Sequence, residues 1–315
     1  MTLTELKYIV AVAREKHFGR AAEACFVAQP TLSVAIKKLE DELGVVIFER
    51  GGSEVSVTPL GQQIVAQAER VLEQTAAIKE IAKQNKDPLA GPLRLGVIYT
   101  IAPYLLPPLV KTMIEHVPQM PLVLQENFTA RLIELLRQGE LDAAIMALPF
   151  ADQGLLVQPL YDEPFVVALP KDHPWAKRTS INAEELKSET MLLLGNGHCF
   201  RDQVLEVCPE MSRFSTSGDG IARTFEGSSL ETIRHMVASG IGITVLPRAS
   251  VPAQEKQDGM LRYVPFAEPG PSRRVVIAWR KSFTRRPAIE AVRQAVLQCG
   301  LPGVTMLDEA QTAEA

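Results

Sequence analysis

Cysteine is scarce in this chain of 315 residues, and long apolar runs are missing altogether. No run reaches the length that spans a membrane, and residues 1–10 lack the charged-then-apolar layout of a secretory signal. These absences predict a cytoplasmic protein with no membrane contact, and they argue against an exported transport binding protein. Thiols in the cytoplasm stay reduced unless a reaction oxidises them, so the four cysteines are expected to be free unless they take part in redox chemistry.

An excess of positive charge is also lacking. The formal net charge is −4, so bulk charge does not indicate a nucleic-acid binder. Residues 1–58 hold seven Lys or Arg against eight Asp or Glu, and DNA binding by this stretch would therefore rest on a local patch. Internal repeats and low-complexity tracts are absent from the sequence, and its length predicts two or three globular domains.

Two of the cysteines, Cys199 and Cys208, enclose a short segment of helix-forming residues. Gly197 precedes the segment and Pro209 follows it. If the segment is one helix, it carries the chain about 13.5 Å from one cysteine to the other. A disulfide needs Cα atoms roughly 4.4–6.8 Å apart, so the pair could be bridged only if the helix unwinds. The segment is therefore a candidate redox switch.

The first cysteine of the pair lies where a helix N-terminus is expected, and free N–H groups and the helix macrodipole favour an anion there. His198 and Arg201 are its neighbours and also favour the thiolate, the form that attacks oxidants. We assign Cys199 as the reacting thiolate and Cys208 as the resolving thiol. Buried, inert thiols explain the same spacing equally well. A metal site formed by this pair and His198 does not fit zinc-ligand spacing, so we expect no metal and no cofactor.

Apolar spacing in the N-terminal part predicts three helices. Residues 3–13 carry a helical apolar stripe, and residues 20–26 form a short second helix. A third helix is expected at 31–43, opened by Pro30 and ended by Gly44. A short helix, a tight turn and a second helix are typical of a helix-turn-helix.

Two short strands follow, at residues 45–50 and 55–59, around a glycine turn at 51–53, and such a hairpin forms a wing. Several short motifs between residues 18 and 61 point to the same protein family. They are Phe18-Gly19-Arg20-Ala21-Ala22, Gln29-Pro30-Thr31-Leu32-Ser33, Ile36-Lys37-Lys38-Leu39-Glu40, Leu43-Gly44, Phe48-Glu49-Arg50 and Thr58-Pro59-Leu60-Gly61. They resemble the winged helix-turn-helix of LysR-type transcriptional regulators. The resemblance implies a DNA-binding domain at residues 1–58.

The third helix would then be the recognition helix. Such a helix places its N-terminal residues at base edges, where Gln29, Thr31 and Ser33 offer hydrogen bonds. Basic side chains would pair with phosphates. Without the surrounding motifs, Lys37 and Lys38 would be interpreted only as part of a solvent-exposed helix face. The candidate DNA-binding residues are Gln29, Pro30, Thr31, Ser33, Lys37, Lys38 and Arg50.

A long helix is predicted from Leu60 to about Lys86, where Asp87 and Pro88 end it. Its apolar residues alternate three and four apart, which forms a heptad seam for a partner helix. We interpret residues 59–88 as a dimerising linker; the alternative is an amphipathic helix packed on its own domain. The candidate dimer residues are Ile64, Ala68, Val71, Thr75 and Ile78.

Strands and helices alternate from residue 89 to 300, which indicates an α/β domain with parallel sheets. The layout resembles the effector domain of LysR-type regulators, which implies two Rossmann-like lobes and a cleft, as in periplasmic binding proteins. We expect lobe I at about 89–161 and 268–300, lobe II at about 162–267, and a flexible tail at 301–315. The predicted fold is thus an all-α winged helix-turn-helix, a long linker helix and a two-lobed α/β domain.

Two threonines follow predicted strands of lobe I at the cleft end, Thr100 and Thr129. Helix N-capping is the commoner use of a threonine at such a position. The run at 197–202, together with Cys208, resembles the hydrogen-peroxide-sensing branch of the LysR family. That resemblance implies that the two threonines hold peroxide near the reactive cysteine. The candidate peroxide-binding and supporting residues are Thr100, Thr129, His198 and Arg201.

We predict a DNA-binding transcription regulator, and not an enzyme, that senses hydrogen peroxide through Cys199 and a disulfide to Cys208 and controls oxidative-stress genes. Expected partners are double-stranded DNA, RNA polymerase, hydrogen peroxide, a thiol reductant of the glutaredoxin or thioredoxin type, and further copies of the chain, from dimer to tetramer. One rival is a LysR-type regulator that senses a metabolite in the cleft, with inert cysteines. A second rival, a thiol peroxidase, does not account for the DNA-binding pattern.

Overall fold

The computed structural model describes residues 1–49, 55–83, 87–151, 154–207, 224–227, 229–252 and 259–307. Arg50 and Cys208 therefore lie outside the described residues. The chain forms two compact units, one made mainly of Met1–Lys86 and one made mainly of Asp87–Ala315. Within the described ranges, no helix combines the length and the apolar composition needed to cross a bilayer.

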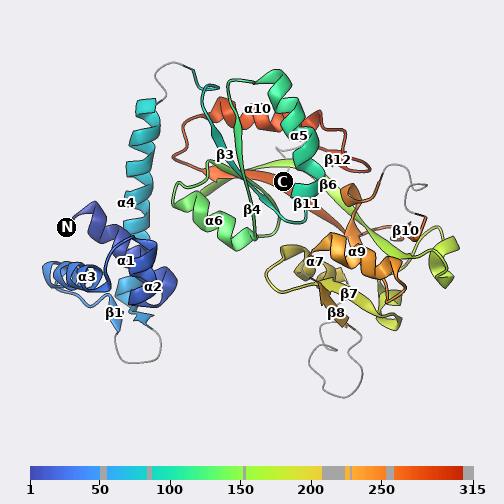
Figure 1. Ribbon diagram of the computed structural model, residues 1–315, viewed down its shortest axis with the longest axis horizontal. Coiled ribbons are helices and arrows are strands. Elements are labelled where there is room, and N and C mark those ends of the chain that lie inside the picture. The colour runs from blue at the N-terminus through green and yellow to red at the C-terminus, as the bar shows by residue number, and fades with distance from the viewer. Residues whose placement is uncertain are drawn as a thin grey trace. The chain divides into compact units, whose positions relative to one another are not determined.

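The N-terminal unit is a winged helix-turn-helix, as predicted. Its elements are α1 (Leu3–Glu15), α2 (Phe18–Ala24), α3 (Gln29–Leu43), β1 (Phe48–Glu49), β2 (Ser56–Val57) and α4 (Pro59–Lys83) (Figure 1). Ile9, Leu32 and Phe48 are buried in a shared core, so the apolar stripes of the helices face one another. β1 and β2 pair antiparallel and form the wing. α3 begins two residues before the predicted start because Pro30 fits the first turn of a helix.

The helix α4 is the predicted long linker helix. Its first half packs on α1, where Val65 and Ala68 are buried. Ala68 is therefore a correction to the predicted seam, because its turn of the helix faces the unit's own core. Val71 and Ile78 leave apolar surface uncovered, and Ile78 is 67% exposed. The remaining seam residues, Ile64 and Thr75, are half-buried.

The C-terminal unit has two lobes built around one mixed sheet. Lobe I contains β3 (Leu93–Ile98), α5 (Ala102–His116), β4 (Leu122–Asn127), α6 (Thr129–Arg137), β5 (Ala143–Ala147), the start of β6 (Leu155–Pro170), β11 (Ser272–Arg280), α10 (Arg286–Leu297) and β12 (Thr305–Met306). Lobe II contains the end of β6, η1 (Pro174–Lys177), η2 (Ala183–Ser188), β7 (Met191–Leu194), α7 (Cys199–Val207), β8 (Thr224–Gly227), α9 (Leu230–Ala238), β9 (Thr244–Pro247), η3 (Arg248–Ser250) and β10 (Leu261–Pro265). In lobe I, α5 packs beside α10 and α6 lies on the other side of the sheet (Figure 1).

The strand order is β10-β6-β11-β5-β3-β4, with β9 and β12 also paired to β6. The prediction of parallel sheets is right for β3, β4 and β5, and for the separate pair β7 and β8. It is wrong for β6 and β11, which pair antiparallel with their neighbours. These two strands carry the chain between the lobes.

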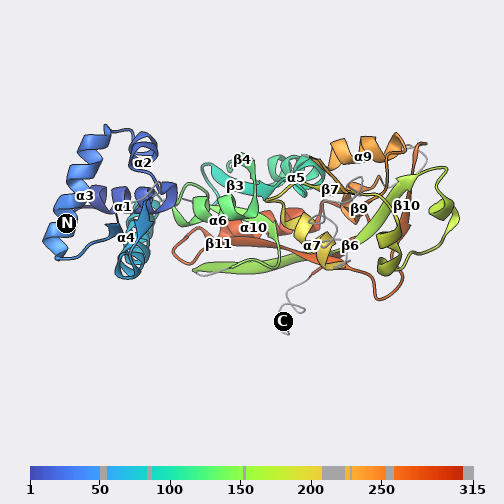
Figure 2. The ribbon, with the colours of Figure 1, turned by 90° about the horizontal axis from the view of Figure 1, so that it is seen from below.

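The strand β6 belongs to both lobes, and Figure 2 shows it running from one into the other. Its residues 155–164 pair with β11 in lobe I, and residues 165–170 pair with β9 and β10 in lobe II. The change of partners occurs beside Glu163. A side chain at this position is therefore placed where the two lobes meet.

Residues 301–307 correct the prediction of a tail without structure. β12 pairs antiparallel with β6 opposite Asp162 and Tyr161, and Leu301 and Leu307 are buried. The backbone N–H of Leu307 donates to the carbonyl of Leu160 at 3.0 Å. A strand of two residues is too short to show an alternating pattern, which is why periodicity missed it. The rest of the predicted tail, from residue 308, lies outside the described residues.

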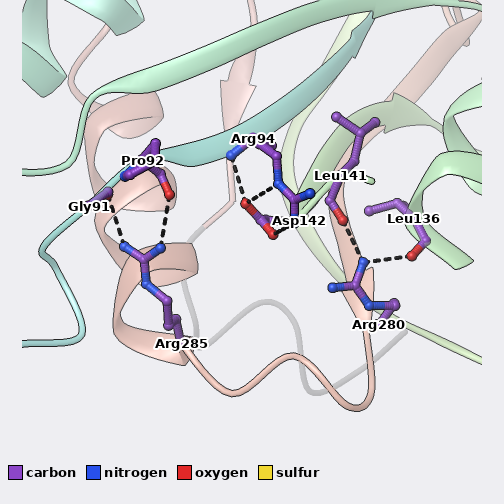
Figure 3. A network of polar contacts seen from close by, with 8 residues as sticks. All are labelled: Gly91, Pro92, Arg94, Leu136, Leu141, Asp142, Arg280 and Arg285. Atoms are coloured by element: carbon purple, nitrogen blue, oxygen red, sulfur yellow. Dashed lines mark hydrogen bonds and ion pairs between the residues drawn. The ribbon is translucent and has the colours of Figure 1, made fainter. Parts of the chain in front are cut away.

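Three arginines connect separate segments of lobe I through hydrogen bonds and an ion pair (Figure 3). Arg285 donates to several carbonyls of the segment that enters the lobe, including that of Pro92 at 3.0 Å. Arg94 on β3 forms a two-point ion pair with Asp142, which precedes β5. Arg280 donates to two carbonyls around the end of α6. The buried guanidinium groups of Arg280 and Arg285 thus meet acceptors, and the half-buried Arg94 meets a carboxylate.

Candidate functional site

Cys199 is the first residue of α7. Gly197, two residues before it, has φ +96°, a backbone conformation that requires glycine, and it lies in contact with the ring of Phe128. Phe200 and Val204 are buried in the core of lobe II and anchor the helix. The sequence therefore turns sharply and presents Cys199 at a helix N-terminus, where free N–H groups favour an anion.

The helix keeps the ends of the cysteine segment apart. α7 continues to Val207, so the Cα atoms of Cys199 and Val207 lie about 12 Å apart along its axis. Cys208, the predicted resolving thiol, follows directly and is outside the described residues. Among the residues that are described, the cysteines are free thiols.

A small cavity opens beside Cys199 where the two lobes meet. Its volume is about 10 Å³ for the centre of a water-sized sphere, which is room for one small molecule. The walls come from the carboxyl ends of β3 and β4 and from the start of α7. They are Ile98, Tyr99, Thr100, Asn127, Phe128, Thr129, Gly197, His198 and Cys199. The structure thus brings both predicted threonines, the histidine and the cysteine together.

Neither threonine hydroxyl is seen capping a helix. Thr100 accepts a hydrogen bond at Oγ1 from Nη1 of Arg273, at 2.8 Å, and α5 begins two residues later without a side-chain cap. Oγ1 of Thr129 is buried and has no hydrogen-bond partner within the described part of the chain. A buried hydroxyl without a partner costs free energy. A small polar molecule in the cavity would satisfy it.

Thr100 is held by a buried ion pair that the sequence analysis missed. Arg273 on β11 and Glu163 on β6 are each 1% exposed and approach to 2.8 Å. The second carboxylate oxygen of Glu163 accepts from the backbone N–H of Ala249 at 2.8 Å, and the guanidinium lies 5.1 Å from the ring centroid of Phe200. Because the Thr100 oxygen accepts from arginine, its own hydrogen remains available to donate into the cavity.

Three rings form the aromatic wall of the cavity: Tyr99, Phe128 and His198. Their centroids lie 5.2 Å apart for Tyr99 and Phe128, 4.8 Å for Phe128 and His198, and 5.9 Å for Tyr99 and His198, all edge to face. His198 is buried, whereas Tyr99 and Phe128 are 39% and 37% exposed. Tyr99 and Phe128 therefore lie at the partly exposed margin of the cavity.

Arg201, predicted to support the peroxide site, does not line the cavity. Its Nη1 donates to the carbonyl of Leu194 at the end of β7, at 3.5 Å. Gln203, further along α7, does reach lobe I, because its Nε2 donates to the carbonyl of Leu148 at 2.7 Å. α7 is thus tied to both lobes by polar side chains.

Some of the missed residues carried a sequence signal and others did not. Tyr99 and Phe128 directly precede the two threonines, so the strand ends that revealed Thr100 and Thr129 could have revealed them. Arg273 is 173 residues from Thr100 in the sequence, and only the return of β11 to the sheet brings the two together.

The two remaining described thiols lie in less reactive surroundings. Burial raises the pKa of the Cys25 thiol. Burial also raises the pKa of Cys299 to about 11, and its Sγ donates to the carbonyl of Ala295 at 3.2 Å. Both thiols therefore hold their protons at neutral pH.

The predicted DNA-contacting residues lie on the uncovered side of α3. Leu32, Ile36 and Leu39 are buried against the core of the unit, which turns the opposite side of the helix outward. Ser33 is half-buried, and Arg50 is outside the described residues. The exposed candidates are Gln29, Pro30, Thr31, Lys37 and Lys38.

Two family models cover the two units. Residues 3–62 match the bacterial regulatory helix-turn-helix protein of the lysR family, and residues 86–299 match the LysR substrate binding domain. The chain belongs to the LysR family. This family consists of transcription regulators, in which the helix-turn-helix precedes the two-lobed domain.

Within the LysR family, OxyR proteins are among the similar relatives of this chain. The DNA-binding transcriptional dual regulator OxyR of Escherichia coli K12 is 40% identical over 296 residues, covering 94% of this chain and 95% of the relative. The structure is similar to a full-length OxyR variant from Pseudomonas aeruginosa, with 53% identity, a TM-score of 0.71 and 98% of each chain covered. It also resembles an H2O2-bound OxyR mutant of Corynebacterium glutamicum, with 34% identity, a TM-score of 0.62 and coverage of 95% and 92%. The chain is therefore a LysR-type regulator of the OxyR branch.

Proposed function

We propose that this LysR-type regulator senses hydrogen peroxide through oxidation of Cys199. The observation that carries the proposal is the buried, unpartnered Oγ1 of Thr129 in a one-molecule cavity that Cys199 also lines. Hydrogen peroxide fits such a site because it is small and both donates and accepts hydrogen bonds. The H2O2-bound relative and the OxyR branch as a whole support this choice of ligand.

The first step is a two-electron oxidation of the cysteine. The Cys199 thiolate attacks one peroxide oxygen, the O–O bond breaks, and hydroxide leaves. The products are Cys199 sulfenic acid and, after the hydroxide takes one proton, water. The hydroxyls of Thr100 and Thr129 orient the peroxide, and the buried His198 ring beside them offers a proton relay.

The second step joins the two cysteines. The Cys208 thiol attacks the sulfenic sulfur, an S–S bond forms, and a second water leaves. A disulfide needs Cα atoms within about 7 Å, and α7 holds Val207 about 12 Å from Cys199. The disulfide therefore requires that α7 unwinds. A thiol reductant of the glutaredoxin or thioredoxin type returns both cysteines to thiols by exchange.

Unwinding of α7 would break contacts in both lobes. Phe200 leaves the core of lobe II and its position beside Arg273, and Gln203 loses its bond to Leu148 in lobe I. A change of this kind repacks the lobes and the contacts between copies. In this proposal, it alters how paired helix-turn-helix domains span DNA and how they engage RNA polymerase.

DNA binding is assigned to α3 and the wing. Gln29, Thr31 and Ser33 lie at the N-terminus of α3, which enters the major groove in helix-turn-helix complexes. Lys37 and Lys38 are exposed further along the helix, where they suit phosphates.

Pairing of copies is assigned to α4. An apolar groove of about 280 Å³ runs beside the helix and is lined by residues that include Leu43, Ile64 and Val71. A partner helix placed there would cover apolar surface that the chain leaves exposed, as in a heptad seam. Higher assembly to a tetramer would use further surfaces of the C-terminal unit.

The metabolite-sensing rival is less well supported. The interlobe cavity at Cys199 has room for about one water-sized molecule, and a typical metabolite is much larger. The peroxidase rival leaves the helix-turn-helix without a role.

The proposal is tested by mapping thiols after a brief, near-stoichiometric peroxide treatment of the reduced full-length protein. Alkylation, digestion and mass spectrometry should recover a linked Cys199–Cys208 peptide, with Cys25 and Cys299 still alkylated. In Cys199→Ser the linked peptide should vanish, whereas the control Cys25→Ser should form it at the normal rate. Four unreacted thiols in the wild type would refute the proposal that Cys199 is oxidised by hydrogen peroxide.

A further inference from the structure

Two rings of the aromatic wall, Tyr99 and Phe128, have no part in the chemistry described above. Phe128 carries no polar side-chain atom, and Tyr99 makes its described contacts through its ring. Both rings are more than a third exposed, so they gain less from folding than buried aromatics do. Because they both line the cavity and are partly exposed, we consider a role toward molecules that approach from outside.

The wall is held in place from several sides. Phe128 packs edge to face on both Tyr99 and His198, and the backbone of Gly197 lies against its other flank. The backbone N–H of Phe128 donates to Oδ1 of Asn127 at 3.0 Å, and its carbonyl accepts from Leu132 in the first turn of α6. The Phe128 ring is therefore held in place as part of the cavity lining.

We propose that Tyr99 and Phe128 set the peroxide specificity of this site by size, admitting hydrogen peroxide and excluding bulky alkyl hydroperoxides. The inference rests on the proposed function. The thiolate attacks the terminal oxygen along the O–O axis, so the leaving oxygen and any alkyl group on it must extend away from Cys199. Hydrogen peroxide carries only a hydrogen there, whereas a tert-butyl group adds four carbons to a molecule in a cavity with room for about one water-sized molecule.

The reaction with an alkyl hydroperoxide balances in the same way as the first step. Thiolate, hydroperoxide and one proton give sulfenic acid and the alcohol. The chemistry at sulfur is unchanged, so any difference in rate between the two oxidants reports access and fit. Removing the Phe128 ring should therefore change the ratio of the two rates.

The test measures Cys199 oxidation rates in full-length protein with hydrogen peroxide and with tert-butyl hydroperoxide, by quenched alkylation and mass spectrometry. In Phe128→Ala we expect the tert-butyl hydroperoxide rate to rise about tenfold, while the hydrogen peroxide rate changes less than about threefold. Tyr99→Ala should shift the ratio in the same direction. Phe128→Tyr keeps the ring and should behave as the wild type.

Three results would overturn the inference: an unchanged ratio in Phe128→Ala, an equal rise of both rates, or a wild type that already reacts equally fast with both oxidants. A wild type that does not react with hydrogen peroxide at Cys199 would instead refute the proposed function. Because Tyr99 and Phe128 are partly exposed, the two alanine variants provide independent folded proteins for the test.

A second observation, independent of the first, lies in the turn between α2 and α3. Phe26 is 96% exposed and has φ +56°. It follows the C-cap of α2 in a Schellman motif, with the N–H of Phe26 bonded to Glu23 and that of Val27 to Ala22, each at 3.0 Å. Glycine is the residue that suits this backbone, and the phenyl ring gains no burial there.

From this placement we infer that Phe26 contacts DNA, at a thymine methyl group in the major groove. The inference rests on DNA binding by α3. Phe26 precedes Gln29, the first residue of α3, by three positions, and the N-terminus of a recognition helix lies at base edges. Apolar side chains distinguish thymine through its C5-methyl group.

Phe26→Gly separates a DNA contact from a structural role, because glycine relieves the positive φ. The thermal midpoint of the variant should stay level or rise, while its affinity falls about three- to tenfold. The probe is a duplex selected from a random pool by full-length wild-type protein, measured at one fixed salt concentration. Val46→Ala, which changes another exposed apolar residue of the same unit, is the matched control.

Replacing each thymine of that duplex by deoxyuridine removes one methyl at a time. The wild type should bind more weakly when the methyl group is missing at one or two positions. The affinity of Phe26→Gly should not change at those positions. The inference fails if the variant binds as tightly as the wild type or remains sensitive to the same methyl groups. Failure of the wild type to select any duplex would refute DNA binding itself.

Discussion

Two neighbouring carboxylates on β6 show how far burial changes the value of one interaction. Glu163 pairs with Arg273, and Asp162 pairs with Arg274, in both cases at 2.8 Å. The first pair is 1% exposed, whereas the second is about one-third exposed. The hydrogen bonds that Arg274 donates to Asp162 raise the pKa of the Arg274 guanidinium, but solvent screens that pair. Breaking the Glu163–Arg273 ion pair should therefore lower the stability of the fold more than breaking the Asp162–Arg274 ion pair.

Glu163→Gln should destabilise the C-terminal unit by about 3–5 kcal/mol, because it leaves the charge of Arg273 buried and uncompensated. The matched variant Asp162→Asn should cost about 0–1 kcal/mol. Denaturant unfolding of both variants and the wild type measures the difference. Equal losses would contradict the argument. Glu163→Gln should also slow Cys199 oxidation, since Thr100 is held by the same guanidinium.

The raised pKa of Cys299 predicts its reactivity. The folded-state pKa is about 11 against an ordinary value of 9.0, so the thiol keeps its proton as the pH rises through 9 and loses it only near 11. Iodoacetamide should alkylate Cys299 about a hundredfold more slowly in the native protein than in the urea-unfolded protein at about pH 8. Peptide mapping against time measures both rates. Equal rates would show that burial does not protect this thiol.

At the scale of elements, two short segments, α7 and β12, have roles in the proposed switch and in the sheet that their length alone does not indicate. α7 has nine residues and two buried apolar anchors, Phe200 and Val204. A helix of this length is marginal without tertiary contacts, which suits the unwinding that we propose for it. β12 has only two residues, yet it covers part of the edge of β6 in lobe I.

Leu307→Ala tests the contribution of the β12 segment. The side chain is buried beside the end of β12, so its truncation should cost about 2 kcal/mol. Thr305→Ala, on the exposed side of the same strand, should change stability by less than about 0.5 kcal/mol. Thermal or urea unfolding compares the two variants. A neutral Leu307→Ala would mean that this segment does not hold the sheet.

At the scale of the whole molecule, the lobes are joined by strands and by polar side chains. β6 and β11 both run through the region where the lobes meet. Tyr104 at the start of α5 donates from its hydroxyl to Glu231 at the start of α9, at 2.7 Å. Burial raises the pKa of Tyr104, so this hydroxyl remains a donor throughout the physiological range. Opening the lobes would therefore break a bond as well as bend strands.

Assembly of copies is predicted to depend on the uncovered face of α4. Ile78 is 67% exposed, so Ile78→Asp should leave the folded unit intact while weakening the dimer about tenfold or more. Gln74→Asp changes the charge in the same way on an exposed position of the same helix that lies outside the predicted seam. Light scattering across a dilution series measures the mass of each variant. A dimer that resists Ile78→Asp would place the interface elsewhere.

The local patterns of the sequence determined most of the elements and part of the site. Helical spacing and Pro30 revealed the recognition helix, and strand ends placed Thr100 and Thr129 beside each other. Gly197 and the residues after it indicated a helix that starts at Cys199. These predictions succeeded because capping, turn formation and strand periodicity act between residues that are close in the chain.

The tertiary structure alone decided the features that depend on long-range contacts. Arg273 reaches Thr100 only because β11 returns to the sheet next to β6, and β12 is a strand only because β6 offers it a free edge. The buried state of Ala68 depends on how α4 lies on α1. The size of the cavity depends on three separate segments, 98–100, 127–129 and 197–199, that meet beside Cys199. None of these follows from local pattern, because each is an interaction between residues that the fold, and not the sequence, makes neighbours.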